Sequence, residues 1–455
     1  MKTFVLAALL AACTSSVLAA PTIVKGTGFI GNISSQGHQS GGQEYVVLFD
    51  STKPTPPDVA EVLTRIQLSP DHADVKYMFN NSAFGGFVAN MKSHCIDALN
   101  AMEDVAHVEQ TVAIKSHALQ SRPGYPWGTQ RISSSDTVKG KAKDARAFTY
   151  SFDDDKLGAG VDIYIIDTGV RTTHRVFEGR ARQGFSFEQN TVDGDGHGTH
   201  VAGTAAGDFF GIASRANVWA VRVLNDKGSG QSSDTIAGMD WVINNHNKRK
   251  TEPGFVGSIM SMSWGIPGIA DTVNKVILAA SDQGIHVSVA AGNDNTDACE
   301  NTPATNGGSK SAIISVGAID IEDKIASFSN TGTCVDVYAP GVDILSSWAT
   351  ADNHIEFLSG TSMACPHVTG VMAYLMAQDV GRFGQDPKAL KEEVLSLARK
   401  GAVDGSAITG DAKLLVSNGA NGNKKKRGSA KWVVVDPEDN NFEASDVDSK
   451  LVLRY

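Results

Sequence analysis

Cysteine and charge are both scarce in this chain of 455 residues. Five cysteines are too few for a disulfide-rich scaffold. Charged residues make up 20% of the chain, and 50 acidic against 40 basic side chains give a net charge of −10. No broad cationic face can form, so the composition excludes a nucleic-acid-binding role. The hydrophobic content of 41% is too high for a disordered chain and predicts a globular protein with a large core.

Long apolar runs are also missing, except for a short one at the N-terminus. Lys2 precedes an apolar run over residues 4–12, and small residues follow up to Ala19 and Ala20. A membrane span needs about 20 apolar residues, and the polar residues 14–16 end this run early. The pattern is typical of a secretory signal that is removed after Ala19. We therefore expect a secreted, extracellular protein without a stable membrane anchor, whose cysteines meet oxidising conditions.

The first folded region follows a linker at 22–43 that is rich in Gly, Ser and Gln. Strand-like alternation and helical spacing then alternate in the order strand, helix, strand, strand, helix, strand. This order predicts a small ferredoxin-like α+β domain over 44–117. The expected elements lie at 45–49, 57–68, 75–79, 84–89, 93–102 and 105–114.

The larger region begins near Gly160 and contains short, β-branched apolar runs. Such runs are typical of buried parallel strands, and helical segments separate them. This alternation predicts an α/β fold with a mostly parallel sheet and helices on both faces. The expected strands lie at 161–166, 218–223, 258–263, 286–290 and 313–316, and the expected helices near 198–207, 233–247, 270–283 and 362–377.

Three reactive side chains lie where strands end or helices begin in this larger region. Asp167 ends a buried strand, His197 lies between two glycines, and Ser362 begins a long apolar helix. Each has an ordinary structural explanation, because aspartate often caps a turn and serine often caps a helix. Each also has a functional one, because strand ends line ligand crevices and helix N-termini favour developing negative charge.

A zinc site is one alternative for the two histidines, His197 and His200. Zinc-binding helices of metalloproteases place their histidines four apart, with Glu directly after the first. Here the histidines are three apart, no Glu follows, and Gly198 is a poor helix former. The spacing therefore disfavours a metal-dependent hydrolase.

Taken together, the three side chains indicate nucleophilic catalysis. A serine is a weak nucleophile unless a base takes its proton, and that base needs a third group to orient it. The chain order Asp167, His197, Ser362 is the order found in subtilisin. Asn293 follows another apolar strand, where its carboxamide could donate a hydrogen bond to an oxyanion.

Four motifs in this order closely resemble the subtilisin family of serine proteases, and above all its proteinase K-like branch. They lie at 166–169, 197–204, 291–293 and 360–364. The resemblance covers about 118–418, and residues 44–117 are similar to the family's inhibitory propeptide. It implies a three-layer subtilisin-like fold and four parts of the chain: signal peptide 1–19, propeptide 20–117, peptidase domain 118–418 and C-terminal extension 419–455.

The resemblance implies a role for each reactive residue. Ser362 would be the nucleophile, His197 the general base and then acid, and Asp167 the carboxylate that orients the histidine. Asn293 would stabilise the oxyanion together with the backbone N–H of Ser362. His200 corresponds to a structural position of the family.

The family also binds extended peptides between two edges, through main-chain hydrogen bonds that tolerate many sequences. Basic-specific, kexin-like relatives carry acidic residues after Ser-Trp-Gly, whereas 266–268 is Ile-Pro-Gly here. We therefore expect an apolar or aromatic residue before the scissile bond (the P1 residue). The implied substrate-binding residues are Gly228, Ser229, Gly230, Ser263, Trp264, Gly265, Ala291 and Gly292.

Three cysteines would remain after the signal and propeptide are removed, so at least one thiol is unpaired. Cys299 and Cys334 resemble a disulfide pair of some proteinase K-like enzymes. Cys365, one turn after the expected nucleophile, then remains as a small buried hydrophobe.

No cofactor is expected for catalysis, but the family often carries a structural calcium. The resemblance places one such site at the carboxylate of Asp336 and the backbone oxygens of Ser311 and Ile313. A carboxylate with carbonyl groups is the kind of oxygen cage that calcium prefers.

The sequence thus predicts a monomeric secreted serine endopeptidase that acts on proteins and peptides. The resemblance further implies a self-processing zymogen, cut near residues 117 and 118, with the propeptide as its intramolecular inhibitor. One alternative remains besides the metal-dependent hydrolase, namely an inactive, propeptide-bound binding module.

Overall fold

A computed structural model describes residues 42–50, 57–80, 84–111 and 119–420. The expected signal peptide, the expected processing site near 117–118 and nearly all of the expected C-terminal extension lie outside these residues. The chain divides into two compact units, Met1–Ser116 and His117–Tyr455. Each unit is described by itself.

The first unit contains an antiparallel sheet with strand order β2-β3-β1-β4. Its elements are β1 (Gln43–Phe49), α2 (Val59–Arg65), β2 (Val75–Asn80), β3 (Gly85–Met91), α3 (Ser93–Asn100) and β4 (Val105–Gln110). This succession confirms the predicted order of strands and helices, with β4 ending at Gln110 instead of residue 114. Helix α2 begins where expected because the Asp58 side chain accepts hydrogen bonds from the N–H groups of Ala60 and Glu61.

The second unit is built on a parallel sheet with strand order β15-β14-β12-β10-β7-β9-β8. Five strands match the expected runs: β7 (Val161–Asp167), β9 (Asn217–Arg222), β10 (Gly257–Met262), β12 (His286–Ala290) and β14 (Ile314–Ile319). The two edge strands, β8 (Ala181–Ser186) and β15 (Val337–Pro340), were not predicted. Strand β8 has no β-branched residue and β15 ends in proline, so neither resembles a buried central strand.

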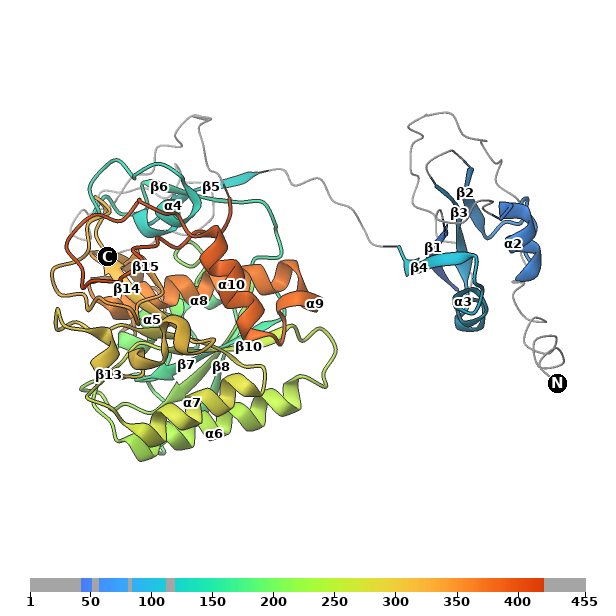
Figure 1. Cartoon of the computed structure of the whole chain (residues 1–455). Helices are drawn as coiled ribbons and strands as arrows, with labels where there is room; N and C mark the ends of the chain where they lie inside the picture. Colours follow the sequence, from blue (N-terminus) through green and yellow to red (C-terminus); the bar gives the residue numbers. More distant parts are fainter. Residues whose placement is uncertain (1–41, 51–56, 81–83, 112–118, 421–455) are drawn as a thin grey trace, which may run out of the picture. The chain divides into compact units, whose positions relative to one another are not determined.

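Helices cover both faces of this sheet, as Figure 1 shows. Helices α5 (His197–Ala206) and α8 (Thr361–Gln378) lie on one face, and α6 (Ser232–Arg249) and α7 (Asp271–Asp282) lie on the other. Side chains of β7 alternate between the two cores, with Ile163 and Ile165 facing α5 and α8 and Tyr164 facing α6 and α7. The three-layer α/β fold is therefore confirmed.

Shorter elements complete the second unit: β5 (Gln120–Tyr125), α4 (Trp127–Ser133), β6 (Phe148–Phe152), β11 (Ile266–Pro267), β13 (Asn301–Thr302), β16 (Ile344–Ser347), β17 (Ile355–Leu358), α9 (Val380–Phe383) and α10 (Pro387–Leu397). Among the described residues, none of the helices has the length and apolar character that crossing a membrane would require.

Candidate active site

The carboxylate of Asp167 and the imidazole of His197 are in direct contact. Asp167 is the last residue of β7 and is fully buried, while His197 begins α5 with its side chain 25% exposed. Nδ1 of His197 lies 2.7 Å from Oδ1 of Asp167. An ionised carboxylate only accepts hydrogen bonds, so Nδ1 carries the proton and Nε2 is left as a basic nitrogen.

Glycines allow the start of α5 to approach the end of β7 this closely. A Cβ atom on Gly198 would lie 2.1 Å from the carbonyl oxygen of Gly169, which immediately follows β7 and Thr168. Gly196 has a φ of 109°, and a Cβ there would overlap the ring of Trp348. Side chains at these two positions would therefore push His197 away from Asp167.

The same carboxylate changes the acidity of the histidine. Burial by itself would lower the pKa of His197, but the negative charge of Asp167 and its hydrogen bond outweigh burial. The pKa of His197 is therefore raised above its usual 6.5. This side chain becomes neutral, and able to accept a proton, only above that usual value.

Ser362 lies in the first turn of α8, and its side chain bonds to the neighbouring strand segment. Its Oγ donates to the carbonyl of Ser263 at 2.8 Å, and the Oγ of Ser263 donates back to the carbonyl of Ser362 at 3.0 Å. A hydroxyl has one proton, so Ser362 does not donate to His197 in this rotamer.

Two hydrogen bonds join Asn293 to Thr361, the residue directly before Ser362. The Oδ1 atom of Asn293 accepts from both the N–H and the hydroxyl of Thr361, at 2.8 and 2.9 Å, which leaves Nδ2 free to point elsewhere. The Nδ2 group is the hydrogen-bond donor that Asn293 has left, and these two bonds hold it next to the start of α8.

The Nε2 atom of His200, unlike that of His197, is engaged in hydrogen bonds. His200 is fully buried, and its Nε2 lies 3.0 and 3.1 Å from the carbonyl oxygens of Ile344 and Glu356. Since carbonyl groups only accept, Nε2 must carry a proton and cannot bind zinc. Burial lowers the pKa of His200 to about 3. This histidine is held neutral and joins α5 to the β16–β17 hairpin.

A pocket of about 240 Å³ opens beside Ser362. Four of the expected substrate-binding residues line it, namely Trp264, Gly265, Ala291 and Gly292, together with Asn293. Sequence reasoning missed the rest of its lining, which consists of Ile266, Pro267, Ala290, Asp294, Asn301, Thr302, Ala304 and Thr361. No local pattern marks residues 301–304 as pocket residues, because only the fold brings them beside residue 265.

The other expected substrate edge lies apart from this pocket. Gly228, Ser229 and Gly230 form an exposed turn beyond β9, closed by a hydrogen bond from the N–H of Asn225 to the carbonyl of Ser229. A Cβ on Gly228 would have Asp195, two residues before the active-site histidine, as its nearest neighbour at 3.9 Å. The structure thus places this turn near the histidine and Ser263–Gly265 near the serine.

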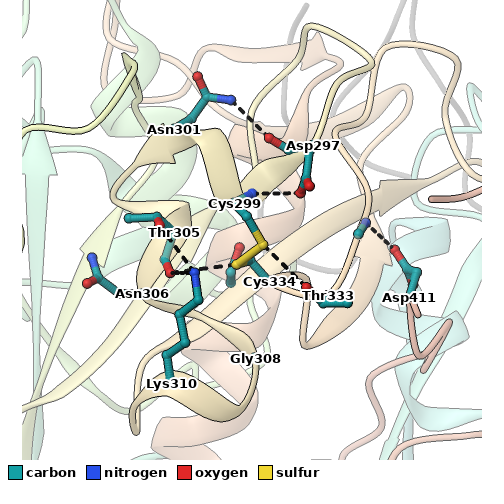
Figure 2. The surroundings of a disulfide bond; sticks show 12 residues. Asp297, Cys299, Asn301, Thr305, Asn306, Gly308, Lys310, Thr333, Cys334 and Asp411 are labelled. Carbon is teal, nitrogen blue, oxygen red and sulfur yellow. Dashed lines mark hydrogen bonds between the residues drawn. A yellow bond between two sulfur atoms is a disulfide. The ribbon is translucent and has the colours of Figure 1, made fainter. Parts of the chain in front are cut away.

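The disulfide between Cys299 and Cys334 is present and is shown in Figure 2. It joins the segment before Asn301 to the segment before β15. Lys310 donates to the carbonyl of Thr305 in the same loop region, at 3.1 Å. The pairing implied by the family resemblance is therefore confirmed. Cys365 is a buried free thiol, and burial raises its pKa.

The structure does bring Ser311, Ile313 and Asp336 together, but around a lysine. The Nζ of Lys391 donates to the carbonyl oxygens of Ser311 and Ile313 and lies 2.8 Å from Oδ1 of Asp336. The ammonium group fills the place where the resemblance puts calcium. The residues present therefore do not fit a calcium ion at this position.

Known proteins resemble this chain over most of its length. The sequence profile of the subtilase family matches residues 158–426. A cuticle-degrading serine protease of Arthrobotrys oligospora is 40% identical over 350 residues, which cover 76% of this chain and 80% of that protein. The subtilisin-like serine protease Pen ch 18 of Penicillium rubens is 39% identical over 329 residues, covering 70% of this chain and 65% of that protein.

A solved structure shows the same fold. The crystal structure of a cold-adapted subtilisin-like serine proteinase matches with a TM-score of 0.56 and 34% identity, covering 65% of this chain and 98% of that one. Profile, relatives and fold all point to the same family. The chain belongs to the subtilase family and is a subtilisin-type serine endopeptidase.

Proposed function

We propose that Ser362, His197 and Asp167 together hydrolyse peptide bonds without a cofactor. The contact of 2.7 Å between Nδ1 of His197 and Oδ1 of Asp167 carries this proposal. It fixes the tautomer that leaves Nε2 free to take a proton, which is the requirement for activating a serine hydroxyl.

The first chemical step requires Ser362 to change its hydrogen-bond partner. Its proton points to the carbonyl of Ser263 in this structure, so the hydroxyl group has to turn away from that carbonyl to donate to His197. An extended peptide that binds along Ser263 would bring a backbone N–H that competes for that carbonyl. Substrate binding would then favour the reactive rotamer.

Charge develops on the carbonyl oxygen of the substrate as Oγ attacks. The Nδ2 group of Asn293 and the N–H of Ser362 would donate hydrogen bonds to that oxygen, since both residues line the same pocket. The N-terminus of this helix, which has 18 residues, adds a favourable dipole. The C–N bond then breaks as His197 gives the proton to the leaving amine, and the acyl group stays on Ser362. Water that has lost a proton to His197 attacks this acyl group, the acid leaves, and the proton returns to Ser362.

The pocket beside Ser362 would accept an apolar or aromatic P1 side chain of the substrate. Gly265 and Ala291 carry little or no side chain and so leave space for a large substrate side chain, and Asp294 is the one charged residue among the described residues of the lining. Main-chain pairing of the substrate with the pocket edges would make the remaining specificity broad.

We also propose that the protein is exported as a zymogen, cuts itself near residue 118 and acts as a monomer. The small α+β unit would serve as the intramolecular inhibitor. Support comes from the apolar N-terminal segment, from a disulfide typical of an oxidising compartment, and from the separate folding unit that ends at Ser116. Cleavage of a tethered segment would be effectively unimolecular.

The proposal can be tested by comparing the full, unmodified chain with the variants Ser362→Ala and Ser359→Ala. Ser359 lies three residues earlier and only accepts a hydrogen bond from the N–H of Asp343. The unmodified protein and Ser359→Ala should react with a fluorophosphonate probe, resist chelators and yield two fragments. Ser362→Ala should remain unlabelled and uncut.

Two results would argue against the proposal. Labelling of Ser362→Ala would place the nucleophile elsewhere in the chain. Cleavage of Ser362→Ala near residue 118, in a preparation free of other proteases, would show that a second enzyme performs the maturation.

A further inference from the structure

One lysine of the second unit has its terminal amino group inside the protein. Lys391 lies in α10 and is 7% exposed, and its Nζ is surrounded by four oxygen atoms. Three are the carbonyl oxygens of Gly308, Ser311 and Ile313, at 2.7, 2.9 and 2.8 Å, and the fourth is Oδ1 of Asp336 at 2.8 Å. We call these four oxygens the lysine cage.

The cage satisfies this ammonium group completely. An ammonium has three hydrogens, so four oxygens within 2.9 Å already exceed its capacity to donate. Asp336 is 5% exposed, and its other oxygen, Oδ2, accepts from the N–H of Ser315 at 2.8 Å. Buried charges are tolerated only when they are paired and hydrogen-bonded in this way.

The dimensions of the cage suit an ammonium better than a calcium ion. Distances of 2.7–2.9 Å are those of charge-assisted hydrogen bonds, whereas calcium takes six to eight oxygens at about 2.3–2.6 Å. The single charge of Asp336 is balanced by the single charge of Lys391. A calcium ion added beside this lysine would leave two excess positive charges in a buried site.

The loop next to the cage packs closely against the segment that carries Asp336. A Cβ on Gly307 would lie 2.2 Å from the carbonyl oxygen of Cys334 and 2.9 Å from Oδ2 of Asp336, and a Cβ on Gly308 would lie 2.2 Å from the carbonyl oxygen of Thr333. The backbone at Gly307 and Gly308 therefore lies directly against the segment before β15. Lys391 joins this loop and Asp336 to α10, which are three segments distant in sequence.

We infer that the side chain of Lys391 is the resident cation of this cage and takes the place of a structural calcium. The second unit then carries its own cation at this position, and its stability there depends on the charge of a lysine and is independent of dissolved metal. This inference concerns stability and is separate from the proposed catalytic roles.

Thermal unfolding of the full chain tests the inference, with Ser362→Ala as the parent to prevent self-digestion. Lys391→Met keeps a flexible chain but removes the charge, which leaves the Asp336 carboxylate buried and unpaired. We expect its Tm to fall by roughly 5–10 °C. Lys388→Met, at an exposed lysine of the same helix, is the matched control and should shift Tm by no more than about 2 °C.

The double variant Lys391→Met, Asp336→Asn separates loss of charge from loss of packing. It removes both charges and should unfold at a higher temperature than Lys391→Met alone, or recover soluble protein if Lys391→Met fails to fold. A double variant no more stable than Lys391→Met would overturn the inference, as would a Lys391→Met Tm equal to that of the control.

Calcium provides the remaining arm of the experiment. Millimolar calcium or a chelator should change the Tm of the parent by no more than it changes the Tm of the Asp336→Asn derivative. Any effect of calcium on Tm would then come from a site other than the lysine cage. A stabilisation by calcium that Asp336→Asn abolishes would show that the ion enters the cage, and would refute the assignment of Lys391.

Discussion

Replacing Gly265 with valine should convert a pocket for large side chains into one for small side chains. Gly265 lines the pocket, its φ is not in the left-handed region, and an added Cβ would find its nearest neighbour, the carbonyl oxygen of Thr302, at 3.8 Å. The protein can therefore accept the side chain without strain. The volume that valine occupies is taken from the substrate.

The size of the effect follows from the atoms that no longer fit. Valine adds three carbon atoms to a pocket of about 240 Å³. If an aromatic P1 side chain loses the burial of three such groups, at about 0.8 kcal/mol each, the loss is about 2.4 kcal/mol. That free energy corresponds to a fall of roughly 60-fold in kcat/KM. A P1 alanine, which does not reach this depth, should lose less than about threefold.

Paired chromogenic peptides that differ only in P1, phenylalanine against alanine, measure the change. Gly381→Val is the matched control, because Gly381 is exposed and its added Cβ would also find its nearest neighbour at 3.8 Å. The ratio of the two kcat/KM values should change in Gly265→Val and stay constant in the control. Equal losses for both peptides would refute the assignment of Gly265 to the P1 pocket.

Other predictions concern the catalytic groups and the disulfide. Because the pKa of His197 is raised above 6.5, kcat/KM should increase with pH through a midpoint above that value, as the imidazole loses its proton; a pH profile measures it, and a midpoint below 6.5 would contradict the role of Asp167. Asp167→Asn should move that midpoint down and lower kcat by about 10⁴-fold, the loss known for the same change in the triad of trypsin-type proteases. Asn293→Ala should lower kcat by about 10²–10³-fold with little change in KM, the loss known for the oxyanion asparagine of subtilisin; steady-state kinetics that show mainly a KM effect would contradict it. Replacing Cys299 and Cys334 with serine opens a link across 35 residues and should lower the free energy of unfolding by about 3–4 kcal/mol in denaturant titrations, whereas an unchanged midpoint would show that the link is not stabilising.

Side-chain periodicity was sufficient to locate the central strands and their helices. Strand β7 has buried side chains on both faces, so its sequence contains an unbroken apolar run from Ile163 to Ile166. The edge strand β8 and the helix α10 carry no such run, because only one side of each is buried and their partners are distant in sequence. The pattern of apolar residues therefore locates an element reliably when the element is buried on all sides, and poorly when only one side is buried.

The identities of the reactive residues were also readable from sequence. Asp167, His197 and Ser362 each lie at the end of an element with glycine nearby, since a reactive side chain must be uncovered and closely approached. Their distances were not readable. Only the packing of α5 against β7 brings the aspartate and histidine to 2.7 Å, and only the folded segment at Ser263 provides the acceptor that holds the serine hydroxyl.

Residues 301–304 of the pocket lining and the lysine cage depended entirely on tertiary structure. Thr302 pairs with Ile266, next to Gly265, and no periodicity in the sequence predicts that contact. Sequence resemblance found the oxygens of Ser311, Ile313 and Asp336 but could not show which cation they hold. In the folded chain Lys391, which lies 55 residues after Asp336, provides this cation. A buried carboxylate must be neutralised, and the fold determines which positive charge lies within reach.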